Sequence, residues 1–139
     1  MASAAEEQLC PICRDSRPPD LIAELPTVWV TAPPLAPLPA YLCVVAKRHV
    51  VEPFQLPPAE LAAFWTECMS VAKALHEAVD PLKMNYEIHG NTIPHLHMHL
   101  FPRTPEDPYV GFVITNRVWF RRSREELDQL GAAIRAALR

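Results

Sequence analysis

The chain has 139 residues, half of them apolar, and carries a formal net charge of -3. This length suits one domain with a buried core, and the apolar fraction excludes an intrinsically disordered chain. The small negative charge offers no broad attractive surface for nucleic acid or for an anionic membrane. We therefore expect neither as a partner, and an anionic substrate would have to be attracted by a local site.

The N-terminal residues, MASAAEEQLC, lack the basic and apolar regions of a secretory signal. No apolar run approaches the roughly 20 residues that a membrane span needs. Four cysteines without an export signal are expected to be thiols or metal ligands. These features predict a cytoplasmic protein. We find no internal repeat and treat residues 1–139 as a single domain.

Cys10 and Cys13 form a Cys-x-x-Cys motif ahead of any predicted strand. Such a pair is half of a zinc site or a redox couple. A thioredoxin-type redox pair lies between a strand and a helix, which this position does not offer. A zinc site needs two more ligands, of which His49 is one candidate, while free thiols and a disulfide remain alternatives.

Proline is unusually common, with 16 residues in the chain, more than twice the average usage of about 5%. The segment APPLAPLP at 32–39 cannot form a helix and is expected to be a stiff extended connector. TVWV at 27–30 and YLCVVA at 41–46 predict two strands. Cys43, within the second of these strands, and Cys68 are expected to be core residues.

Two helices are predicted further along the chain. Apolar residues recur with the helical period from Pro58 to about Val79, and Pro81 ends this helix. The second helix occupies 123–139, where Ser123 and Glu126 form a capping box. Its apolar face is formed by Leu127, Leu130, Ile134 and Leu138.

The segments 83–89 and 95–101 alternate with period two and are separated by GNTIP, which predicts two antiparallel strands. The expected fold class is α+β, with an antiparallel sheet, one long helix and one C-terminal helix. In a strand, His95, His97 and His99 would share one face, with Leu96, Met98 and Leu100 on the core side.

Three imidazoles on one face indicate chemistry, since each ring nitrogen needs a partner when it is buried. One possibility is a zinc site with an open position for an activated water. The other is an imidazole that attacks phosphorus while its neighbours stabilise the phosphoryl charge. Asn91 and Thr92, just upstream, are neutral donors suited to phosphate oxygens, and no carboxylate pair lies nearby to hold a catalytic metal.

GNTIPHLHMHLFPR at 90–103 resembles the signature of the histidine triad family, in which three alternating histidines are followed closely by Pro-Arg. YLCVVAKRHVVEPFQLPPAEL at 41–61 resembles the family's strand, turn and helix start, and the resemblance covers most of residues 10–105. It implies the histidine triad fold, homodimers, and hydrolysis or transfer of nucleotidyl groups. The diadenosine polyphosphate hydrolases are the most similar branch, so these dinucleotides are the candidate substrates.

The resemblance also implies a role for each residue of the motif. His97 would be the nucleophile that forms a nucleotidyl-histidine, which water then hydrolyses. His99 would contact the phosphoryl oxygens and help the leaving group, and His95 would orient the site. Asn91, with Thr92 beside it, would hold phosphate.

Some bacterial members that carry the Cys-x-x-Cys pair resemble this chain in a further respect. That resemblance implies a structural zinc ion held by Cys10, Cys13, His49 and His95, with residues 1–15 as a zinc-binding segment and no organic cofactor. A closed set of two cysteines and two histidines has no open position and is therefore structural.

Two departures from the family pattern concern the nucleoside. Where members place a ribose-binding acid or amide, this chain has TAPP at 31–34, in which only Thr31 can donate, and the family's Gly-His step is replaced by Ala40 and Tyr41. The resemblance therefore does not fix the nucleoside. Two alternatives to the hydrolase remain: a nucleotide-binding sensor or partner-binding module with little turnover, and a zinc-dependent hydrolase that uses the triad histidines as ligands.

Several other side chains have two interpretations each. His89 lines the pocket or lies at an exposed edge, and Arg103 meets phosphate or pairs with an acid. Trp119 and Phe120 stack on a base or pack against a second subunit. A basic cluster is either solvated or contacts a polyphosphate or a dimer partner; it comprises Arg117, Arg121, Arg122 and Arg124.

Overall fold

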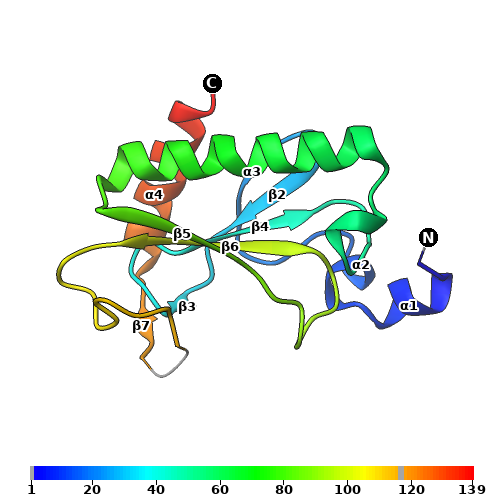
Figure 1. The fold of residues 1–139 in the computed structure, drawn as a ribbon, viewed down its shortest axis with the longest axis horizontal. Coiled ribbons are helices and arrows are strands. Elements are labelled where there is room, and N and C mark those ends of the chain that lie inside the picture. The colour runs from blue at the N-terminus through cyan, green and yellow to red at the C-terminus, as the bar shows by residue number, and fades with distance from the viewer. Residues whose placement is uncertain (1, 116–117) are drawn as a thin grey trace.

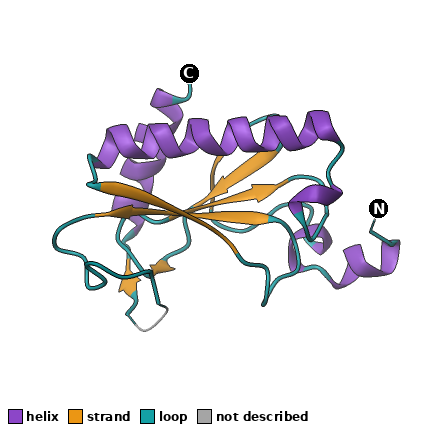
Figure 2. Ribbon diagram, in the orientation of Figure 1, coloured by secondary structure: helices purple, strands orange, loops and turns teal. Residues whose placement is uncertain are grey.

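The computed structural model describes residues 2–115 and 118–139 and has the predicted α+β architecture (Figures 1 and 2). A five-stranded sheet has the order β1-β2-β4-β6-β5, and every neighbouring pair is antiparallel. Its strands are β1 (Leu21–Glu24), β2 (Val28–Thr31), β4 (Leu42–Ala46), β5 (Lys83–Ile88) and β6 (His97–Arg103). Strand β1 was not predicted from the sequence.

Helix α3 (Pro58–Val79) lies along one face of the sheet and has the predicted bounds (Figure 1). It ends at Val79 and is capped by Asp80, whose φ of 51° is left-handed, directly before Pro81. Helix α4 (Arg124–Ala137) begins with the predicted capping box of Ser123 and Glu126 and contacts α3 and β1. Ile134 of its predicted apolar face is fully buried, and Leu127, Leu130 and Leu138 pack against the same core.

Strand alternation divides the core between the two faces of the sheet. Leu42, Val44, Met98 and Leu100 face α3 and join the main core, as does Leu96. The prediction that Leu96, Met98 and Leu100 are core residues is therefore confirmed. Tyr41, Cys43, Val45 and Phe101 form a second cluster on the opposite face, together with Cys10 and Ile12 from the N-terminal segment.

The proline-rich segment forms no helix, as predicted. It is extended only in β3 (Leu35–Ala36), which pairs with β7 (Phe120–Arg121), and bends and a turn follow β3. Arg122 is 5% exposed. Its guanidinium donates to the carbonyl of Tyr41 at 2.7 Å and to those of Pro33 and Pro39, each at 3.1 Å. The interpretation of the basic cluster as a solvated face is therefore wrong for Arg122, because this side chain fixes the segment in place.

The other members of that cluster differ from Arg122. Arg124 is exposed and pairs with Asp128 at 3.6 Å, while Arg117 lies outside the described residues. Before the sheet, the structure adds two short helices that the sequence did not predict, α1 (Ala4–Leu9) and α2 (Pro11–Arg14). In the described part of the chain, no helix is both long enough and apolar enough to cross a membrane.

Candidate functional site

The three histidines do not share one strand, which corrects the sequence prediction. Strand β6 begins at His97, and His95 precedes it. The backbone N–H of His95 donates to the carbonyl of Ile93 at 2.8 Å. The backbone of Leu96 forms hydrogen bonds with Val50 and Ala46, outside the regular strand pairs of β6. This irregular start lets His95 turn its ring toward the N-terminal cysteines, whereas His97 and His99 share one face of β6.

The ring of His97 has a defined tautomer. Its Nδ1 lies 2.5 Å from the backbone oxygen of His95. A carbonyl oxygen only accepts hydrogen bonds, so Nδ1 must carry the proton. In the tautomer with its proton on Nδ1, the ring has its lone pair on Nε2, which is what a nucleophile or a metal ligand needs.

His99 lies between His97 and the aromatic side chains beneath the sheet. Its Nδ1 is 2.7 Å from the hydroxyl of Tyr41, and its ring stacks on Phe101 at 5.9 Å between centroids. Burial, with smaller effects of His97 and His89, lowers the pKa of His99 to about 4. Burial, followed by the neighbouring Cys43, raises the pKa of Tyr41 above its usual range. Both groups are therefore neutral near pH 7.

A pocket of about 320 Å³ opens beside His99. The proline-rich segment forms one wall, and Glu87 of β5 and His89, directly after β5, form another. His89 therefore lines the pocket, and its Nε2 lies 3.1 Å from the Glu87 carboxylate although its side chain is 52% exposed. The remaining lining is apolar or aromatic and includes Tyr41, Phe101, Ile114 and Trp119.

The donors expected for phosphate lie in the connection from β5 to β6. Asn91 and Thr92 are exposed there, and Gly90 has a φ of +98°, a conformation that favours glycine. Their contact with phosphate stays a prediction. Arg103 points elsewhere: it pairs with Asp107 at 2.8 Å and donates to the carbonyl of Tyr109, so it holds the following loop rather than a ligand.

A second cluster, next to the triad, is formed by Cys10, Cys13, His49 and His95. Nδ1 of His95 lies 3.5 Å from the sulfur of Cys10 and 3.6 Å from that of Cys13. Nδ1 of His49 lies 3.2 Å from Cys13 and 3.1 Å from Nδ1 of His95. These four residues are close enough to bind one metal ion.

The chemistry of this donor set fits zinc. Nε2 of His95 donates to the Ala46 carbonyl at 2.6 Å, which leaves the lone pair on Nδ1, facing the cysteines. Usual zinc bond lengths in a tetrahedron separate two nitrogens by about 3.3 Å and a nitrogen from a sulfur by about 3.5 Å. The observed separations of 3.1–3.6 Å match these values. Burial lowers the pKa of His95, so its ring is held in the neutral, metal-binding form.

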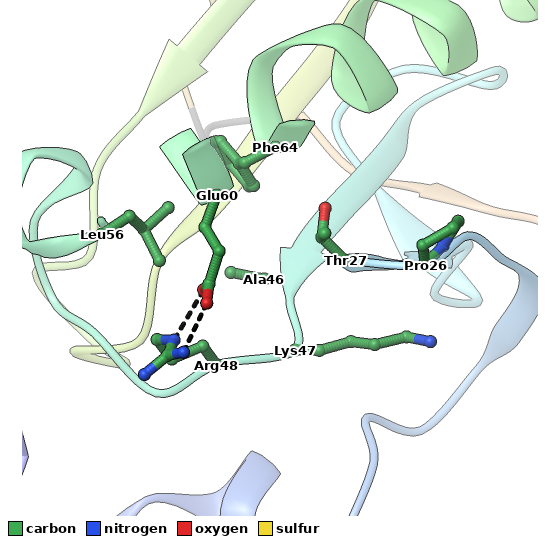
Figure 3. Close-up of a pocket in the computed structure, with 8 residues that line it drawn as sticks. All are labelled: Pro26, Thr27, Ala46, Lys47, Arg48, Leu56, Glu60 and Phe64. Carbon is green, nitrogen blue, oxygen red and sulfur yellow. Dashed lines mark hydrogen bonds and ion pairs between the residues drawn. The ribbon is translucent and has the colours of Figure 1, made fainter. Parts of the chain in front are cut away.

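An ion pair fixes the segment that carries His49. Figure 3 shows Arg48 turned toward Glu60 of α3, with Lys47 pointing away from it. Both oxygens of Glu60 accept from Arg48, with Nε at 2.6 Å. The adjoining hollow of about 440 Å³ has an apolar floor of Leu56 and Phe64. The charged side chains that line this hollow already have ionic partners. We therefore assign to the Arg48–Glu60 pair the role of holding the segment before His49.

Sequence reasoning missed the partners of the triad on the neighbouring strands. Cys43 and Glu87 lie directly opposite His99 in the register of β4 and β5, and Tyr41 lies two residues before Cys43. The alternation of YLCVVA could have placed Tyr41 and Cys43 on one face. Only the strand pairing shows that this face is the one that carries His97 and His99.

The model of the HIT domain matches residues 16–106. A curated relative, the asymmetrical bis(5'-nucleosyl)-tetraphosphatase of Schizosaccharomyces pombe, is 28% identical over 89 residues. That alignment covers 60% of this chain and 48% of the relative, so the chain spans about half the length of the curated protein.

Solved structures give a longer match. A histidine triad protein from Bradyrhizobium japonicum superposes with a TM-score of 0.79 at 26% identity, over 86% of this chain and 90% of that one. A zinc-bound histidine triad family protein from Mycobacterium smegmatis covers 95% of this chain and 94% of its own, with a TM-score of 0.69 and 23% identity. The second match extends over more of the chain than the family model does.

Proposed function

Because the chain belongs to the HIT domain family, we propose that it hydrolyses or transfers the nucleotidyl group of a nucleoside polyphosphate or phosphoramidate through His97. The observation that carries this proposal is the lone pair on Nε2 of His97, which follows from the 2.5 Å bond between its Nδ1 and His95. The relative from Schizosaccharomyces pombe is by name a tetraphosphatase of two nucleosides. Diadenosine polyphosphates are accordingly the first candidate substrates.

In the proposed first step, Nε2 of His97 attacks the phosphorus next to the nucleoside. A phosphorus–nitrogen bond forms while the bond from phosphorus to the leaving oxygen or nitrogen breaks, and the electron pair departs with the leaving group. The imidazole retains its Nδ1 proton, and the positive charge of the adduct faces the His95 carbonyl. His99, whose Nδ1 accepts from Tyr41, would present its Nε2 proton to the phosphoryl oxygens or to the leaving group.

In the second step, water attacks phosphorus and the phosphorus–nitrogen bond breaks. The nucleoside monophosphate is released, the water proton is lost to solvent or to the neighbouring imidazole, and His97 recovers its lone pair. Asn91 and Thr92 are placed in this proposal as donors to phosphate oxygens. Positioning and charge stabilisation of this kind are the main requirements of phosphoryl transfer.

We further propose that Cys10, Cys13, His49 and His95 hold a structural zinc ion. The donor chemistry and the ligand separations support it, as does the zinc-bound relative from Mycobacterium smegmatis. A closed set of four protein ligands leaves no open position, so the ion would cross-link α2, the β4–α3 connection and the start of β6. A homodimer and a cytoplasmic location complete the proposal, and light scattering at twice the mass of one chain would support the dimer.

The decisive experiment captures the covalent intermediate. The protein is mixed with diadenosine tetraphosphate or adenosine phosphoramidate, quenched in milliseconds to seconds, digested under mildly alkaline conditions that preserve phosphoramidates, and analysed by mass spectrometry. We expect an adenylyl group on the peptide that carries His97. In His97→Ala, the adduct and the turnover should both be lost.

His76→Ala is the matched control, because His76 is an exposed histidine on α3. It should retain full turnover and the adduct on His97. Turnover that survives in His97→Ala contradicts the nucleophile. Binding of nucleotide by the parent protein without turnover would instead identify a sensor.

The zinc proposal has a separate test. Cys10→Ser should lower the zinc content of the purified protein well below one ion per chain, whereas Cys68→Ala removes a thiol that lies outside the cluster and should leave it unchanged. Equal zinc in Cys10→Ser and the parent would contradict these ligands.

A further inference from the structure

Beside the proposed zinc cluster lies a second group of metal-binding side chains. Cys43, His97 and His99 each offer one ligand atom, and these atoms lie within 4.8 Å of one another. The three residues come from adjacent strands, with Cys43 of β4 directly opposite His99 of β6. The sheet therefore brings a thiol to the base of the two histidines that the proposed reaction uses.

The hydrogen bonds of the two rings determine which nitrogens can bind a metal. Nδ1 of His97 donates to the His95 carbonyl, which leaves the lone pair on its Nε2. Nδ1 of His99 lies 2.7 Å from the Tyr41 hydroxyl, whose oxygen can also accept. Nε2 of His99 therefore becomes a ligand when the ring proton moves to Nδ1 and is donated to the Tyr41 oxygen. Nε2 of His97 is the atom that attacks phosphorus in the proposed mechanism.

A set of one thiol and two imidazoles selects the metal. Sulfur and imidazole ligands favour Zn²⁺, Cd²⁺ and similar borderline or soft ions over Mg²⁺ and Ca²⁺, which prefer oxygen. Three protein ligands also leave the fourth position of a tetrahedral ion open. That position would take water, or a phosphate oxygen from the pocket.

We propose that Cys43, His97 and His99 form a second, inhibitory metal site, which takes Zn²⁺ or Cd²⁺ and thereby blocks the nucleophile. As the metal–sulfur bond forms, the Cys43 thiol releases its proton to solvent. Metal binding at these three residues is independent of the proposed function. The inhibition rests on the proposed function, because the metal and the substrate phosphorus would compete for the same lone pair of His97.

The two clusters differ in the number of ligands that they offer. The first has four, and its separations of 3.1–3.6 Å match a zinc tetrahedron. The second has three, whose ligand atoms lie within 4.8 Å of one another. The second site should therefore bind more weakly and fill only after the first.

The test counts zinc at fixed free concentrations. The zinc-loaded protein is dialysed against a series of zinc buffers from the nanomolar to the micromolar range, and bound zinc per chain is measured together with turnover. We expect one ion per chain at low free zinc and two at higher free zinc, with turnover lost as the second ion binds. In Cys43→Ser, the affinity for the second ion should fall more than about 100-fold, since losing even an outer-sphere partner costs about 10–100-fold.

Cys68→Ser is the matched control, because it also removes a buried thiol but leaves both clusters intact. It should bind two ions as the parent does. Cys43→Ala serves as a second variant should the serine variant unfold, and circular dichroism confirms that the variants compared are folded. For each variant, inhibition is expressed relative to the turnover of that variant at the lowest free zinc.

Two results would overturn the proposal. One is a parent protein that binds a single ion throughout the range. The other is a Cys43 variant that binds the second ion, or loses activity with it, at the same free zinc as the parent. A parent that binds two ions but turns over no nucleotide would refute the proposed function and leave the metal site standing.

Discussion

The backbone oxygen of His95 lies 2.5 Å from Nδ1 of His97, while Nδ1 of the His95 ring lies 3.5 Å from the sulfur of Cys10. One residue therefore contacts both clusters, through its carbonyl on one side and its ring on the other. The position of the carbonyl sets the orientation of the His97 ring and its tautomer. A change that displaces His95 should therefore also change the orientation of the His97 ring.

Removal of the metal provides the first prediction. A chelator should lower the turnover of the zinc-loaded protein about tenfold or more while the far-ultraviolet circular dichroism stays close to native, because the sheet and α3 have their own core. When free zinc exceeds its dissociation constant 1,000-fold, bound zinc raises the free energy of unfolding by about 4 kcal/mol. The chelator should remove this contribution too. Urea unfolding with and without chelator measures the change. Unaltered turnover after complete removal of zinc would contradict the link from His95 to His97.

The second prediction concerns Tyr41 and His99. Tyr41→Phe removes the hydrogen bond at 2.7 Å and lets the His99 ring lose its fixed tautomer. We expect kcat to fall about tenfold, which corresponds to about 1.4 kcal/mol, with a smaller change in KM. Tyr86→Phe removes the hydroxyl of a tyrosine that is 43% exposed on β5 and should leave kcat unchanged. Equal kcat values in the two variants would rule out a role for the Tyr41 hydroxyl.

The third prediction follows from the partly buried ring of His99. Its pKa is lowered to about 4 in the folded protein, whereas an unfolded histidine titrates near 6.5. Below pH 6.5 the unfolded chain therefore binds more protons, and stability falls as the pH drops from about 6.5 toward 4. For this ring alone the loss should reach about 1–2 kcal/mol at pH 5.

Urea unfolding at pH 7 and pH 5 checks this effect. In His99→Gln, the stability lost between pH 7 and pH 5 should be smaller than in the parent by about 1–2 kcal/mol. Part of the loss should remain, because burial also lowers the pKa of His95. A loss of stability that is the same in parent and variant would show that His99 is not responsible.

The sequence predicted well those elements whose patterns are local. Pro58 and Pro81 bracket the long helix, and α3 runs over Pro58–Val79 as expected. The capping box of Ser123 predicted the start of α4 equally well. In these cases the residues that end or begin an element lie within a turn of it, so the sequence contains the whole signal.

Features that depend on contacts between distant residues were harder to predict. The alternation of His95, His97 and His99 suggested one strand, but the bond from Leu96 to Val50 moves the start of β6 to His97. Arg122 looked like a surface charge because its acceptors are the carbonyls of residues more than 80 positions earlier. The resemblance, by contrast, named the four residues of the metal cluster correctly as neighbours in space.

The fourth prediction tests how Arg122 supports the pocket. Arg122 is 5% exposed, and its guanidinium donates to the carbonyls of Pro33 and Pro39 in the proline-rich segment and to that of Tyr41 just after it. This segment forms one wall of the pocket beside His99. A lysine in place of Arg122 keeps the charge but lacks the planar fork of donors, so buried carbonyls are left without partners. Arg122→Lys should therefore lower the free energy of unfolding by about 2–4 kcal/mol.

The same variant should raise KM for the nucleotide more than it lowers kcat, because the segment lines the pocket whereas the proposed nucleophile, His97, lies on β6. Arg124→Lys is the matched control, since Arg124 is exposed and pairs with the exposed Asp128, and its stability should stay within about 0.5 kcal/mol of the parent. Urea unfolding and steady-state kinetics distinguish the two positions. If Arg122→Lys is as stable as Arg124→Lys and has an unchanged KM, the proline-rich segment must be held by its packing and by its pairing with β7 alone.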